Sequence, residues 1–79
     1  MPVLRRQPRR KLRRLVLAYP PETRAAMLRV LAAPPEYRAE AIRLLYAEQG
    51  SRETAELLMD LESDRSAKAD VMEALRDSL

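Results

Sequence analysis

Apolar residues recur along the chain with the period of an α-helix, and prolines separate the stretches in which they do so. From Arg9 to about Tyr19 the apolar residues take the places i, i+3, i+4 and i+7, while most other positions are basic. This stripe consists of Leu12, Leu15, Val16 and Tyr19, and Leu17 lies off it among the arginines. The pattern predicts a first, amphipathic helix.

Two further helices each begin at a proline pair that is followed by a glutamate. Proline at the first helical position and an acid in the first turn both favour a helix start. The second predicted helix runs from Pro20 to about Ala33, and the third from Pro34 to Gln49, where Gly50 is expected to end it in a left-handed conformation. The residues expected to point inward are Met27, Leu28, Val30 and Leu31 in the second helix, and Ala41, Ile42, Leu44 and Leu45 in the third.

The last segment begins at Ser51, a good N-cap, and reaches Leu79 without another proline or glycine. It forms either one long helix or two, because residues 62–70 lack large apolar side chains and Ser63 or Asp64 could cap a fresh helix. The apolar end of the segment needs a partner surface. We therefore expect self-association, most simply a dimer, through Val71, Met72, Leu75 and Leu79.

These elements predict an all-α fold, a small bundle of three to four short helices joined by proline-started turns. Its 79 residues allow a single domain, so we expect a flexible basic arm over residues 1–8 and one helical domain over residues 9–79. The apolar run from Leu15 to Tyr19 is shorter than the core of a signal peptide. We expect an intracellular, cytoplasmic protein with no membrane span.

Composition removes most enzyme mechanisms. The chain has no cysteine and no histidine, so it lacks a thiol nucleophile, a zinc–thiolate site and the commonest general base. Its single glycine excludes the usual phosphate-binding loops. Glu53, Glu56 and Asp60 lie on adjacent helical turns but are not part of a calcium-loop pattern, and we interpret them as a solvated face. We expect no catalytic residue, no cofactor and no metal.

The formal charge of +3 conceals an uneven distribution. From Glu48 onward nine acidic residues face four basic ones, whereas residues 1–19 contain no acid at all. The basic residues of this head are Arg5, Arg6, Arg9, Arg10, Lys11, Arg13 and Arg14. Arginine forks bidentately onto phosphate or carboxylate. The basic head therefore predicts contact with nucleic acid or with an acidic protein surface.

The second and third helices resemble each other at an offset of fourteen residues, with seven identities in the twelve positions from Pro20 to Leu31. Duplication or shared helix capping explains this, and the alternative is a ladder of equivalent anion contacts formed by Arg24, Arg29, Arg38 and Arg43. The tyrosines, Tyr19, Tyr37 and Tyr46, fall at helix boundaries or on apolar stripes. We expect them to pack at the edge of the core rather than to stack on bases.

The stretch from Leu45 to Leu58, LYAEQGSRETAELL, resembles the first helix, turn and second helix of the trihelical helix-turn-helix domains of resolvases and transposases. The resemblance covers fourteen residues and implies a glycine-containing turn followed by a recognition helix in the major groove. Met59 stands where that glycine would be. The candidate recognition helix carries three acidic residues, Asp64, Asp70 and Glu73, and only two basic ones, Arg65 and Lys68. The phosphate backbone would repel a helix with this excess of negative charge.

The sequence thus favours a small, non-enzymatic regulatory protein whose basic head contacts nucleic acid or a nucleic-acid-handling machine. The alternative is an adaptor or inhibitor whose basic head and acidic C-terminal helix dock on protein surfaces without nucleic acid. Leu17 separates the two, because a leucine exposed among arginines suits a protein or membrane surface better than a phosphate backbone.

Overall fold

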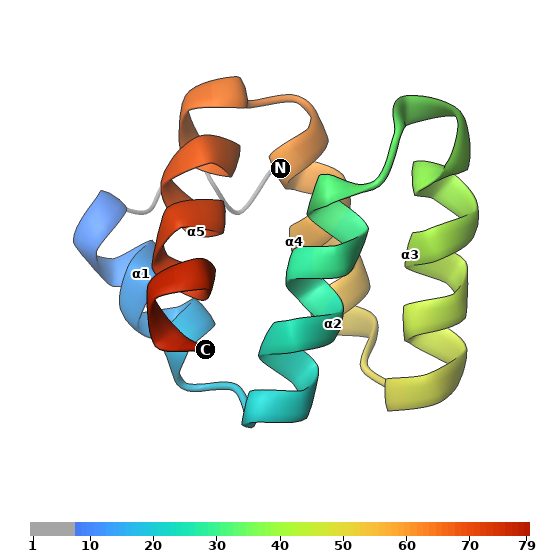
Figure 1. The fold of residues 1–79 in the computed structure, drawn as a ribbon, viewed down its shortest axis with the longest axis horizontal. Coiled ribbons are helices and arrows are strands. Elements are labelled where there is room, and N and C mark those ends of the chain that lie inside the picture. The colour runs from blue at the N-terminus through green and yellow to red at the C-terminus, as the bar shows by residue number, and fades with distance from the viewer. Residues whose placement is uncertain (1–7) are drawn as a thin grey trace.

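In the computed structural model, residues 8–79 are described, and within them the chain forms five helices and no strand. They are α1 (Arg9–Leu17), α2 (Pro21–Ala32), α3 (Pro35–Gln49), α4 (Arg52–Glu62) and α5 (Arg65–Ser78) (Figure 1). The expected all-α class is confirmed. The expected number of three to four helices is wrong, because residues 51–79 form two helices. Arg5 and Arg6 lie outside the described residues, so the flexible arm stays a prediction.

Proline determines where α2 and α3 begin and where α1 and α2 end. Pro21 and Pro35 occupy the first turn of α2 and α3, as expected. The residue before a proline is driven out of the helical region, and Ala33 accordingly has an extended backbone, with ψ of 148°, before Pro34. The same restriction applies to Tyr19, and α1 ends at Leu17.

The two later junctions depend on glycine and on polar caps. Gly50 has a left-handed φ of 66° and ends α3. The Ser51 hydroxyl accepts a hydrogen bond from the Thr54 amide at 3.2 Å and begins α4. The Asp64 carboxylate accepts one from the Ala67 amide at 3.0 Å and begins α5. The last segment thus divides into two helices, with Asp64 as the N-cap of the second.

The helices pack with α1 and α3 on opposite sides of the bundle (Figure 1). Helix α1 packs mainly against α5, and α3 packs against α2 and α4. The chain connects α2 to α3 through residues 33–34 only, so these two helices form an antiparallel hairpin. No helix in residues 8–79 has both the length and the apolar character that a membrane span requires.

All five helices contribute to one core. Its fully enclosed large side chains are Leu12, Val16, Met27, Leu31, Leu58, Leu61, Val71 and Leu75. Of the residues expected to mediate self-association, Val71 and Leu75 are therefore already covered within one chain, Met72 is half-buried, and Leu79 is exposed. A dimer stays a prediction, but Val71 and Leu75 have no accessible surface to offer it.

Four expectations about burial are wrong. Leu15, on the predicted apolar stripe of the first helix, is 38% exposed, and Leu44, which is expected to point inward, is 54% exposed. Tyr37 and Tyr46 are exposed instead of packing at the edge of the core. Only Tyr19, which is half-buried, packs against the core as expected. Tyr37 and Leu44 lie on a second apolar stripe of α3, which the packing of Ile42 and Leu45 into the core leaves facing solvent.

Candidate polyanion-binding surface

Helix α1 is poorly suited to form without tertiary support. Its first turn contains no acid, and Arg9, Arg10 and Lys11 lie where the helix dipole is positive. No side chain caps it, and the carbonyl of Pro8 accepts the first hydrogen bonds, from the amides of Lys11 and Leu12 at 3.0 Å. The helix is therefore stabilised mainly by packing against α5, and an anion at its N-terminus would relieve the charge repulsion.

The inner face of α1 is apolar and is covered by the rest of the chain. Leu12 and Val16 are both 0% exposed, and α5 is the main helix that α1 contacts. Burying two such side chains contributes about 1.5–3 kcal/mol each. This packing fixes which side of α1 faces solvent.

Two of the predicted anion-binding arginines flank the buried stripe and contact α5. Arg9 donates to the Ser66 hydroxyl at 3.0 Å and lies 3.9 Å from the Asp64 carboxylate. Arg13 lies 3.9 Å from the Asp70 carboxylate. The basic head thus meets the acidic C-terminal segment of its own chain. Each pair is partly exposed and contributes at most about 1 kcal/mol, so its main effect is to orient α1.

The outer face of α1 carries three cations that remain available. Arg10, Lys11 and Arg14 are exposed, and none forms an ion pair or side-chain hydrogen bond within residues 8–79. Arg10 and Arg14 are one turn apart at i and i+4, and exposed Leu17 follows at i+7. The surface is therefore a row of guanidinium groups that ends in an apolar side chain.

The four arginines of the repeat are not equivalent in the structure. The guanidinium of Arg38 donates to the Ala33 carbonyl at 2.8 and 3.2 Å and to the Glu62 carboxylate at 2.6 Å. Its counterpart Arg24 is half-buried, with a buried Nε that has no hydrogen-bond partner. The remaining two are exposed, and Arg43 pairs with Glu40 at 3.7 Å. Of the four, only Arg29 is therefore exposed and without an ion-pair partner within residues 8–79.

Sequence reasoning missed the role of Arg38 as a structural clamp. Its two bonds to Ala33 satisfy a carbonyl that the end of α2 leaves without a helical partner, and its bond to Glu62 ties α3 to α4. Lys68 adds a further contact to Glu62, at 3.7 Å, from α5. The sequence signal that could have indicated this role is the position of Arg38, three residues after the proline pair, from which its side chain can reach the end of the preceding helix.

Helix α5 is poorly placed to act as the recognition helix that the helix-turn-helix resemblance implies. It packs against α1, α2 and α4, and Ala67, Val71, Ala74 and Leu75 are buried. One of its two candidate basic contacts, Lys68, is paired with Glu62. Arg65 alone is exposed and has no ion-pair partner within residues 8–79.

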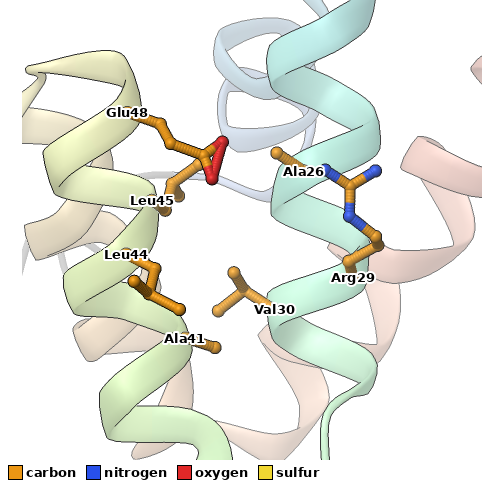
Figure 2. A pocket seen from close by; sticks show the side chains of 7 residues that line it. All are labelled: Ala26, Arg29, Val30, Ala41, Leu44, Leu45 and Glu48. Atoms are coloured by element: carbon orange, nitrogen blue, oxygen red, sulfur yellow. The ribbon is translucent and has the colours of Figure 1, made fainter.

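The structure also contains shallow hollows outside α1. One lies between α2 and α3, has a volume of about 170 Å³ and is lined by Ala26, Arg29, Val30, Ala41, Leu44, Leu45 and Glu48 (Figure 2). Two others adjoin each other where α3, α4 and α5 meet, and they share Pro35, Arg38 and Glu62. In the part of the chain that the structure describes, no three acidic side chains come together as a metal site.

In comparisons with protein-family models, with curated proteins and with solved structures, no significant match to this chain was found.

Proposed function

We propose that this chain is a small, non-enzymatic binding protein that contacts the phosphate backbone of a nucleic acid through the outer face of α1. The observation that carries the proposal is the set of three exposed, unpaired cations, Arg10, Lys11 and Arg14, on a helix without an acid. Leu12 and Val16, on the opposite face of that helix, are buried in the core, so the cations point away from the bundle.

The electrostatics of α1 favour such a ligand. Five of its nine residues are cationic, and three of these lie in the first turn. Phosphate at the helix N-terminus would interact favourably with the helix dipole and would reduce the repulsion among the side chains. Each neutralised phosphate also releases counterions, which is the main source of affinity in contacts that do not read sequence. The proposed contact is therefore with the backbone, without strong sequence preference.

A second candidate function is docking on an acidic protein surface, and the exposed leucines favour it. Leu15 and Leu17 lie beside the arginines on the accessible sides of α1. An apolar side chain adds nothing to a contact with phosphate, whereas protein interfaces combine arginine with apolar anchors. In this reading the chain is an adaptor or inhibitor.

The proposal is tested with labelled oligonucleotides and two matched variants. In the head variant Arg10, Lys11 and Arg14 become alanine. In the control variant three exposed arginines outside α1, Arg43, Arg52 and Arg76, become alanine, so both variants lose three positive charges. Fluorescence anisotropy would measure binding of duplex DNA, single-stranded DNA and RNA. We expect the head variant to lose affinity by about 10- to 100-fold and the control by less than about threefold.

Equal losses in both variants would show that net charge alone drives binding, and no binding by the wild type would reject the proposal. The double variant Leu15→Ser and Leu17→Ser separates the two candidate functions. It should leave nucleic-acid affinity unchanged if the ligand is phosphate. Loss of a protein partner by this variant, with no binding of the wild type to any oligonucleotide, would establish the adaptor function instead.

A further inference from the structure

Helix α3 has a second apolar stripe that faces solvent. Its inner stripe packs into the core through Ile42 and Leu45. On its other side Tyr37 and Leu44 are 60% and 54% exposed, and half-buried Ala41 lies between them. This helix lies at the side of the bundle opposite α1 (Figure 1), so no other part of the described chain covers the stripe.

The stripe borders the hollow between α2 and α3. The hollow is mainly apolar, with Ala26 and Val30 contributed by α2. Figure 2 shows Leu44 and Val30 directed into the gap, and the guanidinium of Arg29 at the same end of it as the carboxylate of Glu48. Neither charged group makes an ion pair or hydrogen bond within residues 8–79. A cavity of roughly 150 Å³ can hold a benzene molecule, so about 170 Å³ is room enough for the end of a leucine.

The outer stripe of α3, defined as Tyr37, Ala41, Leu44 and Glu48, is complementary to itself when it is reversed. Its spacings are four, three and four, which read the same in both directions. In an antiparallel pair centred between positions 42 and 43, Leu44 of each copy falls opposite Ala41 of the other, a large residue against a small one. At each end the Tyr37 hydroxyl, a donor, falls opposite Glu48, an acceptor without a partner in its own chain.

From this self-complementarity we infer that the chain forms a two-fold symmetric dimer through the outer face of the α2–α3 hairpin, with the two α3 helices antiparallel. Leu44 of each copy packs on Ala41 of the second copy and covers the hollow between α2 and α3 of that second copy. Tyr37 of each copy meets Glu48 of the second copy. Arg29 of that second copy lies at the same end of the hollow as its Glu48, where a guanidinium can stack on an aromatic ring. The same patch serves both copies, as closed two-fold assemblies require.

This dimer differs from the one that the apolar end of α5 predicts. It leaves Met72 and Leu79 free and uses residues on the opposite side of the bundle from α1. Both copies of α1 therefore remain exposed in the dimer, and the inference does not depend on what α1 binds.

Sedimentation equilibrium on the full chain tests the inference. We expect the wild type at micromolar concentrations to approach twice the chain mass of 9.1 kDa. Leu44→Asp places two charges in the interface and should raise the dimer dissociation constant by about 100-fold or more, because each substitution occurs twice. Met59→Asp introduces the same change at a leucine-sized side chain that is 60% exposed on α4, and should leave the mass unchanged.

A single variant and a double variant that compensates for it keep the test independent of folding defects. Glu48→Lys should weaken the dimer, and Tyr37→Glu combined with Glu48→Lys should restore it by forming two new ion pairs. Both positions are exposed, so circular dichroism should stay that of the wild type. A monomeric wild type would overturn the inference. So would a dimer that survives Leu44→Asp but dissociates with Leu79→Asp, or a double variant as weak as Glu48→Lys.

Discussion

Arg38 and Arg43 occupy the same helix and look alike in sequence, but their contacts predict very different effects on stability. Arg38 makes three hydrogen bonds, two to the Ala33 carbonyl and one to Glu62, and its side chain is only 18% exposed. Arg43 makes one ion pair with Glu40 at 3.7 Å, and its side chain is 77% exposed. Replacing each arginine by alanine therefore compares the stability lost with a partly buried set of hydrogen bonds with the stability lost with an exposed ion pair.

The magnitude follows from the lost contacts. A hydrogen bond from a charged donor contributes about 1.5–3 kcal/mol, and a partly exposed ion pair at most about 1 kcal/mol. Water can reach the Ala33 carbonyl after the change, and Glu62 keeps its contact with Lys68 at 3.7 Å, so the loss is below the sum. We expect Arg38→Ala to lower the free energy of unfolding by about 2–3 kcal/mol, and Arg43→Ala by less than about 0.5 kcal/mol.

Urea unfolding followed by far-ultraviolet circular dichroism measures this difference, at one fixed protein concentration because self-association shifts the midpoint. Arg38→Lys is the informative intermediate. It keeps the charge but loses the planar fork that reaches both Ala33 and Glu62, so it should recover less than half of the loss. Equal destabilisation by Arg38→Ala and Arg43→Ala would refute the reasoning, and so would full recovery by lysine.

Two further predictions concern the junctions between helices. Gly50 has a φ of 66°, and an added Cβ would meet no atom within 4 Å. Gly50→Ala should therefore lower the free energy of unfolding only by the backbone strain, about 1 kcal/mol, and Gly50→Asn by less. Thermal unfolding measures both variants, and an unchanged stability of Gly50→Ala would contradict the left-handed conformation of Gly50. Asp64→Ala removes the cap of α5 and should cost about 0.5–2 kcal/mol, whereas Asp64→Asn keeps the acceptor and should cost less. Equal losses for the two Asp64 variants in urea unfolding would mean that its charge, beside Arg9, matters more than the cap.

Local signals in the sequence predicted the helix ends well. Proline pairs, Gly50, Ser51 and Asp64 act on the few residues next to them, and the structure places helix ends at all of these positions. The division of residues 51–79 remained open in the sequence because the cap at Asp64 competes with helix continuation across Glu62 to Asp70. Only the packed structure shows which of the two prevails.

The orientation of helices with two apolar stripes could not be predicted. Leu44 and Leu45 are adjacent in sequence and equally apolar, and only packing against α2 and α4 decides that Leu45 is buried. The arginines of the candidate site pose the same problem. Arg9 and Arg13 are paired because α5 brings Asp64 and Asp70 beside them, and these acids lie more than fifty residues away in the chain.

The salt dependence of nucleic-acid binding tests the central claim most directly. If Arg10, Lys11 and Arg14 each neutralise one phosphate, replacing all three by alanine should reduce the slope of log affinity against log salt by about 2 to 3 units. The control variant at Arg43, Arg52 and Arg76 should keep the slope of the wild type. A slope that is the same in the wild type and in the head variant would contradict the claim that the outer face of α1 is the polyanion-binding surface.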